Sequence, residues 1–295
     1  MRLHQKFKHQ FVLLYDSSYN RKHPIYALIR FMRWNVFKLL NYNFHATLWG
    51  YKFKFWINSH QSYWLYKNYY LDSVEFSFID QIVRPNDIIF DIGANVGIYS
   101  FWFSKCINNN GRIYSFEPDE TNMERFKYLI GLNNINSIYP QQIALSNSIA
   151  KAKFSIGLDE QNGLLNDSQS STEQYNIVNT NTIDSFCAEN SVDVINYLKI
   201  DVEGAEWFVL SGATLMLTQH KIKIIQLEIN KQLAKYSISV KQLVDFMAAF
   251  GYKLYRLNSK LKEIDISLEN LLDEDSNNYF FIADLNYINV ERVKK

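Results

Sequence analysis

The segment Asp91-Ile-Gly-Ala-Asn-Val-Gly97 decides the fold of this chain. The apolar run before it, Ile88-Ile-Phe90, predicts a buried strand, and residues 96–106 after it predict a helix. Glycines at such a strand-to-helix turn let backbone N–H groups approach a ligand closely, because no Cβ intervenes. An acid at the strand tip can accept hydrogen bonds from a polar ligand. The segment therefore predicts a pocket for a nucleotide cofactor.

The spacing of the glycines narrows the choice of ligand. Folds that bind dinucleotides use G-x-G-x-x-G, with the pyrophosphate on the N-terminus of the following helix. Here the glycines follow G-x-x-x-G, and Asp91 stands two residues before the first of them. This pattern fits a ligand that lacks a pyrophosphate but carries an amino acid and a nucleoside, namely S-adenosylmethionine (SAM).

Length and composition bound the class of protein. A chain of 295 residues can hold one large domain, or one domain with a small appendage. Its two cysteines, Cys106 and Cys187, form no disulfide framework and favour a reducing compartment. The N-terminus shows no secretory signal, and no run reaches the roughly 18 apolar residues of a membrane-spanning helix. We therefore expect a cytoplasmic protein, with association to a membrane as a further option.

Charge is unevenly distributed along the chain. Residues 1–60 hold ten Lys or Arg and one acid, a net charge of +9, whereas the remainder holds 21 basic and 29 acidic residues, a net charge of −8. Such asymmetry indicates a surface that meets anions: lipid head groups, nucleic acid or a phosphorylated substrate. The alternative is that the two regions attract each other within the fold.

Residues 25–40 predict a helix that begins after Pro24. One face is apolar and comprises Ile25, Leu28, Ile29, Met32, Val36, Leu39 and Leu40. The opposite face carries Arg30, Trp34, Phe37 and Lys38. Aromatic and basic residues together suit a membrane interface, so residues 21–40 are a candidate for peripheral membrane contact through this second face. The alternative is a helix that packs on both sides.

Residues 46–56 predict a β-hairpin with Gly50 in its turn. Aromatic residues alternate there with Lys52 and Lys54, which indicates one solvated face. Interleaved basic and aromatic residues could also bind single-stranded nucleic acid, but an ordinary half-buried hairpin is the favoured interpretation. Residues 1–72 are thus predicted to form an extension that consists of a helix and a hairpin.

From residue 73 onward, strands and helices alternate, which predicts a mostly parallel sheet covered on both faces. The expected core strands are residues 88–91, 112–117, 138–145, 194–201 and 223–229, with terminal strands at 252–257 and 279–284. The expected helices are residues 75–83, 119–132, 182–189, 205–217 and 240–250. A hairpin excursion is expected at residues 153–156 and 175–178.

Acidic residues follow most of the predicted core strands. In open α/β sheets, ligands bind beyond the carboxyl ends of the strands. These ends hold Asp91, Glu117, Ala144 to Ser146, Asp201 to Glu203, and Glu228 to Asn230. One such acid could cap a helix or form an internal salt bridge, because a desolvated carboxylate needs a partner. Four at one edge of the sheet predict a pocket for a cofactor and a substrate.

Three segments carry a resemblance to a known family: residues 89–100, residues 116–118 and residues 198–206. Together with the run Thr182-Ile-Asp-Ser-Phe186, they resemble the FkbM family of SAM-dependent methyltransferases over about residues 75–285. The resemblance implies a class I methyltransferase (Rossmann-like) fold for residues 73–295. This fold has a seven-stranded, mostly parallel sheet whose last strand is antiparallel.

The resemblance also implies how SAM would bind. Gly93, Asn95 and Gly97 would form the turn under its methionine part, and Asp91 would face its ammonium group. Glu117 would accept hydrogen bonds from both ribose hydroxyls, as acids do at the second strand of nucleotide folds.

The far side of the pocket is expected to hold the adenine and the reacting methyl group. Ala144 and Ser146 would lie along the adenine, and Asp201 would lie near the methyl group. Methyl transfer is an in-line displacement at a sulfonium, and a hydroxyl acceptor also needs a base. No histidine lies at a core strand end, so the candidate bases are Asp201, Glu203 and Glu228, or a histidine from the N-terminal region.

A metal offers a third route to activation of the acceptor. Asp201, Glu228 and Asn230 are oxygen ligands at adjacent strand tips, of the kind that Mg²⁺ favours.

The resemblance implies O-methylation, with the acceptor a sugar hydroxyl in a glycan, a lipid-linked glycan or a secondary metabolite, and a place in polysaccharide biosynthesis. An RNA methyltransferase would explain the basic segment, but the chain has no N/D-P-P-Y motif, so nucleic acid is not the favoured partner. An NAD-dependent oxidoreductase is a further alternative, but this chain lacks the G-x-G-x-x-G motif that such enzymes use to bind the dinucleotide. A non-catalytic scaffold that binds SAM is a further alternative, and the oligomeric state stays open.

Overall fold

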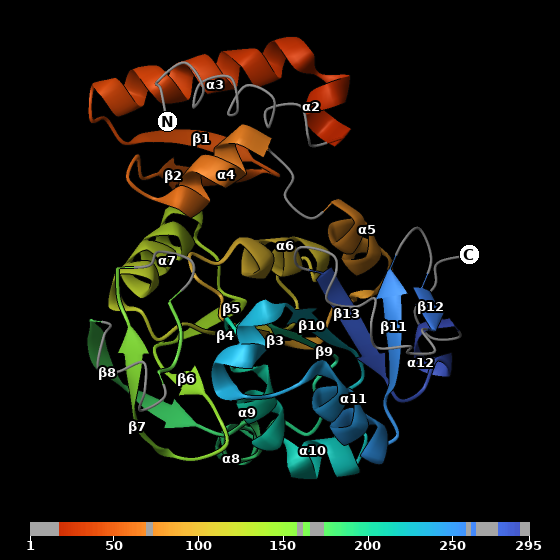
Figure 1. Cartoon of the computed structure of the whole chain (residues 1–295). Helices are drawn as coiled ribbons and strands as arrows, with labels where there is room; N and C mark the ends of the chain where they lie inside the picture. Colours follow the sequence, from red (N-terminus) through yellow and green to blue (C-terminus); the bar gives the residue numbers. More distant parts are fainter. Residues whose placement is uncertain are drawn as a thin grey trace. The chain divides into compact units, whose positions relative to one another are not determined.

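The computed structural model describes residues 18–68, 73–157, 162–165, 174–257, 261–263 and 277–289. The chain forms two compact units, Met1–Ser73 and Val74–Lys295, whose elements are labelled in Figure 1. In the described part of the chain, no helix has both the length and the apolar content that crossing a bilayer requires.

The first unit contains three helices and a hairpin in its described residues. These are α2 (Ser18–Lys22), α3 (Pro24–Leu39), β1 (Phe44–Leu48), β2 (Tyr51–Phe55) and α4 (His60–Asn68). The hairpin is antiparallel, and its turn at Trp49 and Gly50 has the positive φ angles of 55° and 91°. The predicted helix and hairpin are therefore confirmed.

Aromatic side chains form the core of this unit. The ring of Phe44 stacks on that of Phe55 with centroids 5.3 Å apart, and it meets the edge of the Tyr66 ring at 4.8 Å. Trp34 of α3 packs against the same cluster, 6.1 Å from the Phe44 ring. Lys52 points to solvent, whereas Phe55 is buried, so the predicted solvated face of the hairpin is confirmed.

The predicted orientation of α3 is wrong. Its buried residues are Ala27, Phe31 and Trp34, so the face that carries Trp34 packs inward. The aliphatic face is the exposed one, at Ile25, Ile29, Met32, Val36, Leu39 and Leu40. The hairpin and α4 present aromatic rings to α3, and Trp34 buries a larger apolar area against them than any aliphatic residue of the helix could.

The second unit is built on an eight-stranded sheet in the order β12-β11-β13-β10-β9-β3-β4-β5. Its strands are β3 (Ile88–Ile92), β4 (Arg112–Phe116), β5 (Ile138–Gln141), β9 (Tyr197–Ile200), β10 (Ile225–Ile229), β11 (Lys253–Leu257), β12 (Leu261–Glu263) and β13 (Asn277–Ile282). Strand β13 is antiparallel to both neighbours, and the pairs from β10 to β5 are parallel. The predicted seven-stranded, mostly parallel sheet is confirmed, and the short β12 extends it as an antiparallel edge strand that the sequence analysis missed.

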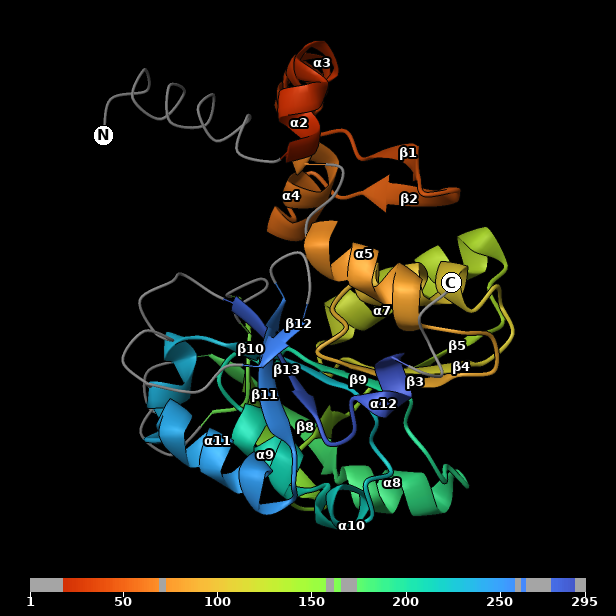
Figure 2. The same ribbon diagram turned by 90° about the vertical axis from the view of Figure 1, so that its right-hand side faces the viewer.

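Helices cover both faces of the sheet, as Figures 1 and 2 together show. On one face lie α5 (Ser73–Ile82), α6 (Ile98–Cys106) and α7 (Glu120–Asn133), and on the other lie α8 (Ile183–Glu189), α10 (Thr214–Thr218) and α11 (Val240–Ala249). The central strands carry buried apolar side chains on both sides: Phe90 and Leu198 on one face, and Ile89 and Tyr197 on the other.

The predicted strand at residues 138–145 is divided in two. Strand β4 ends at Phe116, which pairs with Gln141, so the chain beyond Gln141 has no partner in the main sheet. It turns away and forms β6 (Ala144–Leu145), which pairs with β8 (Tyr175–Asn181). With β7 (Ala150–Ser155), these strands form a separate three-stranded sheet that contains the predicted hairpin excursion.

The predicted helix at residues 205–217 is also divided, into α9 (Glu206–Ser211) and α10. The break lies at Gly212, where a Cβ atom would stand 2.1 Å from the carbonyl oxygen of Ser146. The close approach of these two backbones requires a glycine and bends the helical path.

Candidate cofactor and catalytic site

The turn after β3 is the first part of the site. Gly93, Asn95 and Gly97 have φ angles of 78°, 51° and 86°, which favour glycine and asparagine. A Cβ on Gly93 would lie 1.7 Å from the carbonyl oxygen of Asp201, and the Gly93 N–H donates to the Phe116 carbonyl at 3.0 Å. The turn is thus wedged between the ends of β4 and β9, which explains the glycine at its start.

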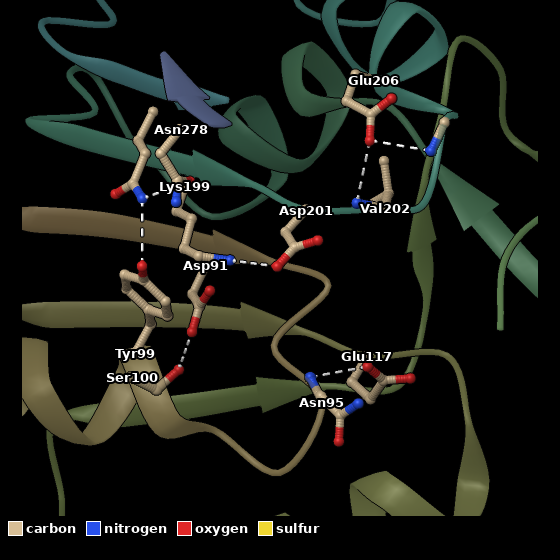
Figure 3. Close-up of polar contacts among 12 residues, drawn as sticks. Asp91, Asn95, Tyr99, Ser100, Glu117, Lys199, Asp201, Val202, Glu206 and Asn278 are labelled. Carbon is tan, nitrogen blue, oxygen red and sulfur yellow. Dashed lines mark hydrogen bonds and ion pairs between the residues drawn. The ribbon is translucent and has the colours of Figure 1, made fainter. Parts of the chain in front are cut away.

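Glu117 lies directly after β4 and faces this turn, as Figure 3 shows. Its Oε2 accepts from the Asn95 N–H at 2.8 Å, and its Oε1 accepts from the Asp119 N–H at 2.8 Å. Each carboxylate oxygen therefore retains acceptor capacity for a second donor. Burial raises the pKa of Glu117 to about 8. The pair of oxygens is suited to accept two neighbouring hydroxyls, as in a ribose.

Asp91, near the end of β3, is almost completely buried. Its Oδ2 accepts from the Ser100 hydroxyl at 2.6 Å. Its Oδ1 is buried and has no hydrogen-bond partner among the described residues. Burial raises the pKa of this carboxyl, and the charge of Lys199 opposes that effect. A buried oxygen without a donor fits a cationic cofactor group, which it can meet directly or through water.

Lys199 on β9 is the residue that sequence analysis missed. Its Nζ lies 2.9 Å from Asp201 Oδ2 and 4.4 Å from the centroid of the Tyr99 ring. Burial lowers the pKa of Lys199, but Asp201 and Asp91 together outweigh it and raise the pKa. The signal in the sequence that could have identified Lys199 is a single cation within an apolar strand, two residues before an acid.

The exposure of the two partners assigns their roles. The Lys199 side chain is 4% exposed, whereas that of Asp201 is 35% exposed. Asp201 is therefore the member of the pair that a ligand can contact, and the buried Lys199 balances its negative charge.

Glu228 on β10 forms a hydrogen bond with Asp201. Burial, and after it the charge of Asp201, raises the pKa of Glu228 well above its ordinary value. Burial would also raise the pKa of Asp201, but Lys199 and the hydrogen bond from Glu228 outweigh it, so the pKa of Asp201 is lowered. The two carboxyl groups act as one coupled pair that shares a proton, which resides on Glu228.

The loop after Asp201 is held by Glu206, which the sequence analysis had not assigned a function. This fully buried side chain accepts from the Gly204 N–H at 3.1 Å and the Val202 N–H at 3.4 Å. Burial raises the pKa of Glu206 to about 7. Glu203, a predicted base, lies in the same loop with a φ of 54° and is partly exposed.

The predicted metal ligands have other partners. Lys199 binds Asp201, and the Asn230 side chain caps the helix η3 (Lys231–Tyr236) by accepting from the Gln232 N–H at 2.8 Å. Within the ranges that the structure describes, no group of three or more His, Cys, Asp or Glu residues could hold a metal ion.

Ala144 and Ser146, predicted beside the adenine, belong to the small sheet. Ala144 pairs with Thr180 of β8, and the Ser146 N–H donates to the Asn181 carbonyl at 2.8 Å. Their place beside the adenine stays a prediction. The structure also has a cavity of about 530 Å³. Its lining includes Pro118, which directly follows Glu117 in the chain, together with Gln142, Phe154 and Ile156.

The chain is similar to several known proteins. The chain is 24% identical over 183 residues to the hexuronic acid methyltransferase AglP of Haloferax volcanii, covering 62% of this chain and 73% of that protein. A solved structure, the methyltransferase FkbM from Methylobacillus flagellatus KT, has a TM-score of 0.44 at 15% identity. That match covers 67% of this chain and 43% of the other, so the chain spans less than half of that protein's length. A SAM-dependent O-methyltransferase from Thermotoga maritima has a TM-score of 0.39 at 11% identity, with 72% and 65% covered.

A family model assigns the domain. Residues 91–254 match the model described as Methyltransferase FkbM domain, which is more than half of the chain. This match removes the NAD-dependent oxidoreductase from the alternatives. The chain belongs to the FkbM family of SAM-dependent methyltransferases.

Proposed function

We propose that this protein transfers the methyl group of SAM to a sugar hydroxyl in a glycan, a lipid-linked glycan or a secondary metabolite. The observation that carries the proposal is the group formed by Lys199, Asp201 and Glu228 at the strand ends beside the Gly93 turn. A partly exposed carboxyl with a proton-sharing neighbour is what a neutral hydroxyl acceptor requires. The relative that is named a hexuronic acid methyltransferase supports a sugar acceptor.

The proposed cofactor site uses the turn and the two buried acids. Glu117 accepts the ribose hydroxyls, and Asp91 balances the positive charge of the methionine ammonium. The adenosine end enters the cavity next to Pro118, whose volume of about 530 Å³ is in the range of small-molecule pockets. When bound, SAM supplies an electrophilic methyl group on a sulfonium.

In the proposed reaction, the hydroxyl oxygen of the sugar bonds to the methyl carbon. The bond from that carbon to sulfur breaks, its electron pair stays on sulfur, and S-adenosylhomocysteine (SAH) leaves. The hydroxyl proton passes to the pair of Asp201 and Glu228, after the pair has lost its own shared proton. Asp201 Oδ2 is already paired with Lys199, and no step of the proposal uses a metal.

The proposal is tested by incubating the protein with SAM and a panel of hexose and hexuronic acid glycosides, with release of SAH as the readout. Formation of SAH with a glycoside, and not with RNA, would support the sugar acceptor. Transfer to RNA alone would favour the RNA methyltransferase, and SAH binding without transfer to any acceptor would favour a scaffold.

The affinity for SAH is expected to rise with pH through about 8. Burial holds the Glu117 carboxyl protonated below that value, and the ionised form accepts from two hydroxyls better than the neutral acid does. Because the ligand favours the ionised form, binding should tighten by up to about tenfold per pH unit below the raised pKa. Isothermal titration between pH 6 and about 9 measures this.

Glu117→Gln, which cannot ionise, should bind SAH weakly and with no such pH dependence, whereas the exposed Glu124→Gln on α7 should match the wild type. A flat profile in the wild type would remove Glu117 from the ribose site.

The rate of methyl transfer is expected to rise with pH until Glu228 is ionised. The pKa of Glu228 is raised by burial and by Asp201, so most of the enzyme at neutral pH carries a proton on the pair and cannot accept another. Glu228→Gln should lower kcat by about 10²- to 10⁴-fold and remove the alkaline rise. Single-turnover rates over the same pH range decide this, and an unchanged profile in the variant would move the base to Glu203.

A further inference from the structure

We propose that α3 lies on the surface of an anionic lipid bilayer and docks the protein there through its exposed aliphatic face. This inference concerns the first unit and is independent of the proposed reaction. The docking face is defined as Ile25, Ile29, Met32, Val36, Leu39 and Leu40.

All six side chains of the docking face are exposed. Their exposed fractions are 72%, 42%, 52%, 53%, 86% and 65% in the order given. Five of them lie on one side of the 16-residue helix, at spacings of three and four residues, and Leu40 is its C-cap. Scattered exposed apolar residues are ordinary, but a continuous aliphatic stripe marks an interaction surface.

The opposite side of α3 is firmly packed, so the helix cannot simply rotate to bury this stripe. Trp34 lies 5.3 Å from the Tyr63 ring and 6.0 Å from the Tyr66 ring, both on α4. Arg30 donates to Asn20 Oδ1 at 2.5 Å, and Asn20 donates to the Lys67 carbonyl at 3.1 Å. These contacts fix which face of the helix is presented outward.

The charge around the docking face selects a negative surface. Residues 18–68 contain eight Lys or Arg and no Asp or Glu. Arg33 borders the stripe on α3, and Lys22, at the end of α2, lies two residues before α3 begins; both are exposed. Tyr26 and Tyr42, which are 65% and 58% exposed, add the amphipathic rings that favour the headgroup region. An aliphatic stripe bordered by cations and aromatic rings is typical of a helix that lies in a membrane interface.

Other occupants fit this surface less well. Nucleic acid binds through its phosphates to Lys and Arg, and it would leave the six aliphatic side chains of the docking face without an apolar partner. A second copy of the same face would bring together two segments that carry eight basic residues each and no acid, and these would repel each other.

The test is flotation of the full-length protein with vesicles of phosphatidylcholine that contain about 30% phosphatidylglycerol, compared with pure phosphatidylcholine. The double variant Ile29→Glu and Val36→Glu changes two exposed positions, so the fold should be retained. We expect the wild type to float with the anionic vesicles and to be released by salt, and the double variant to bind at least tenfold more weakly. The control is Leu215→Glu, which is 64% exposed on α10 and should bind as the wild type does.

The outcomes are distinguishable. Failure of the wild type to float, or equal flotation of the double variant, would overturn the proposal. A wild-type dimer in light scattering that the double variant converts to a monomer, without vesicle binding, would assign the face to a second copy instead. SAH titration of the double variant should match the wild type in every case, so this result is separate from that for the methyltransferase site.

Discussion

Replacing Gly93 with alanine is expected to abolish SAH binding and to lower the free energy of unfolding by about 3 kcal/mol or more. The new Cβ would lie 1.7 Å from the Asp201 carbonyl oxygen, which no side-chain movement can relieve because that atom belongs to the backbone. The positive φ of 78° adds a conformational cost of about 1 kcal/mol. The turn would have to move away from the end of β9, and the Asn95 N–H, which donates to Glu117, would move with it.

Gly157→Ala is the matched control for this change. Gly157 has a similar φ of 87°, but a Cβ there would meet nothing within 4 Å. The free energy of unfolding of Gly157→Ala should therefore fall only by the cost of the positive φ angle, about 1 kcal/mol, and the variant should still bind SAH. Denaturant unfolding and SAH titration of both variants separate the two causes. If Gly93→Ala were no more destabilised than Gly157→Ala, the close approach of the turn to β9 would be wrong.

The parts of this fold that could be predicted from sequence are those that local patterns encode. The run from Ile88 to Gly97 holds a strand, a turn and the start of a helix within ten residues, and the structure confirms each. Parallel strands then bring Asp91, Glu117 and Asp201 to one edge without further information, because the carboxyl ends of such strands coincide.

The errors arise where a distant segment decides the outcome. Periodicity identified which residues of α3 share a face, but Phe44 and Tyr66 determine that the Trp34 face packs inward. The strand predicted to end at Leu145 stops at Gln141 because its partner β4 ends at Phe116.

Lys199 was overlooked for the same reason. The sequence around Lys199 does not reveal which acids surround its ammonium group. Those acids are Asp91, Asp201 and Glu228, and the fold brings them together from two other strands and a loop.

Lys199→Met is expected to lower the free energy of unfolding at pH 7 by about 1.5 to 3 kcal/mol, because it removes the buried partner of Asp201. The loss stays below that of a fully buried pair, since the Asp201 side chain is 35% exposed and keeps part of its hydration. The control is Lys241→Met, which breaks the exposed pair with Asp245 on α11, where the side chains are 63% and 62% exposed. That loss should be about 0.5 kcal/mol or less. Denaturant unfolding of both variants gives the comparison.

The pH dependence of the deficit tests its cause. With Lys199 present, the pKa of Asp201 lies below its ordinary value, so this group stabilises the fold at neutral pH and loses that contribution as pH falls through the lowered pKa. Without Lys199, burial is opposed only by the hydrogen bond from Glu228. We expect burial to raise the pKa of Asp201 above its unfolded value, and the folded variant should then bind protons more tightly than the unfolded chain. Its deficit should therefore shrink as pH falls from 7 toward about 5. A deficit independent of pH would indicate lost packing alone.

The same substitution should move the rate profile of methyl transfer. Lys199 is one of the charges that hold down the pKa of Glu228, so its removal should shift the alkaline rise in kcat to higher pH as well as lower the rate at pH 7. Lost packing would lower the rate at all pH values by one factor and leave the midpoint of the rise in place. A displaced midpoint would therefore identify Lys199 as the residue that sets the proton affinity of the Asp201 and Glu228 pair, and an unmoved midpoint would leave it with a structural role only.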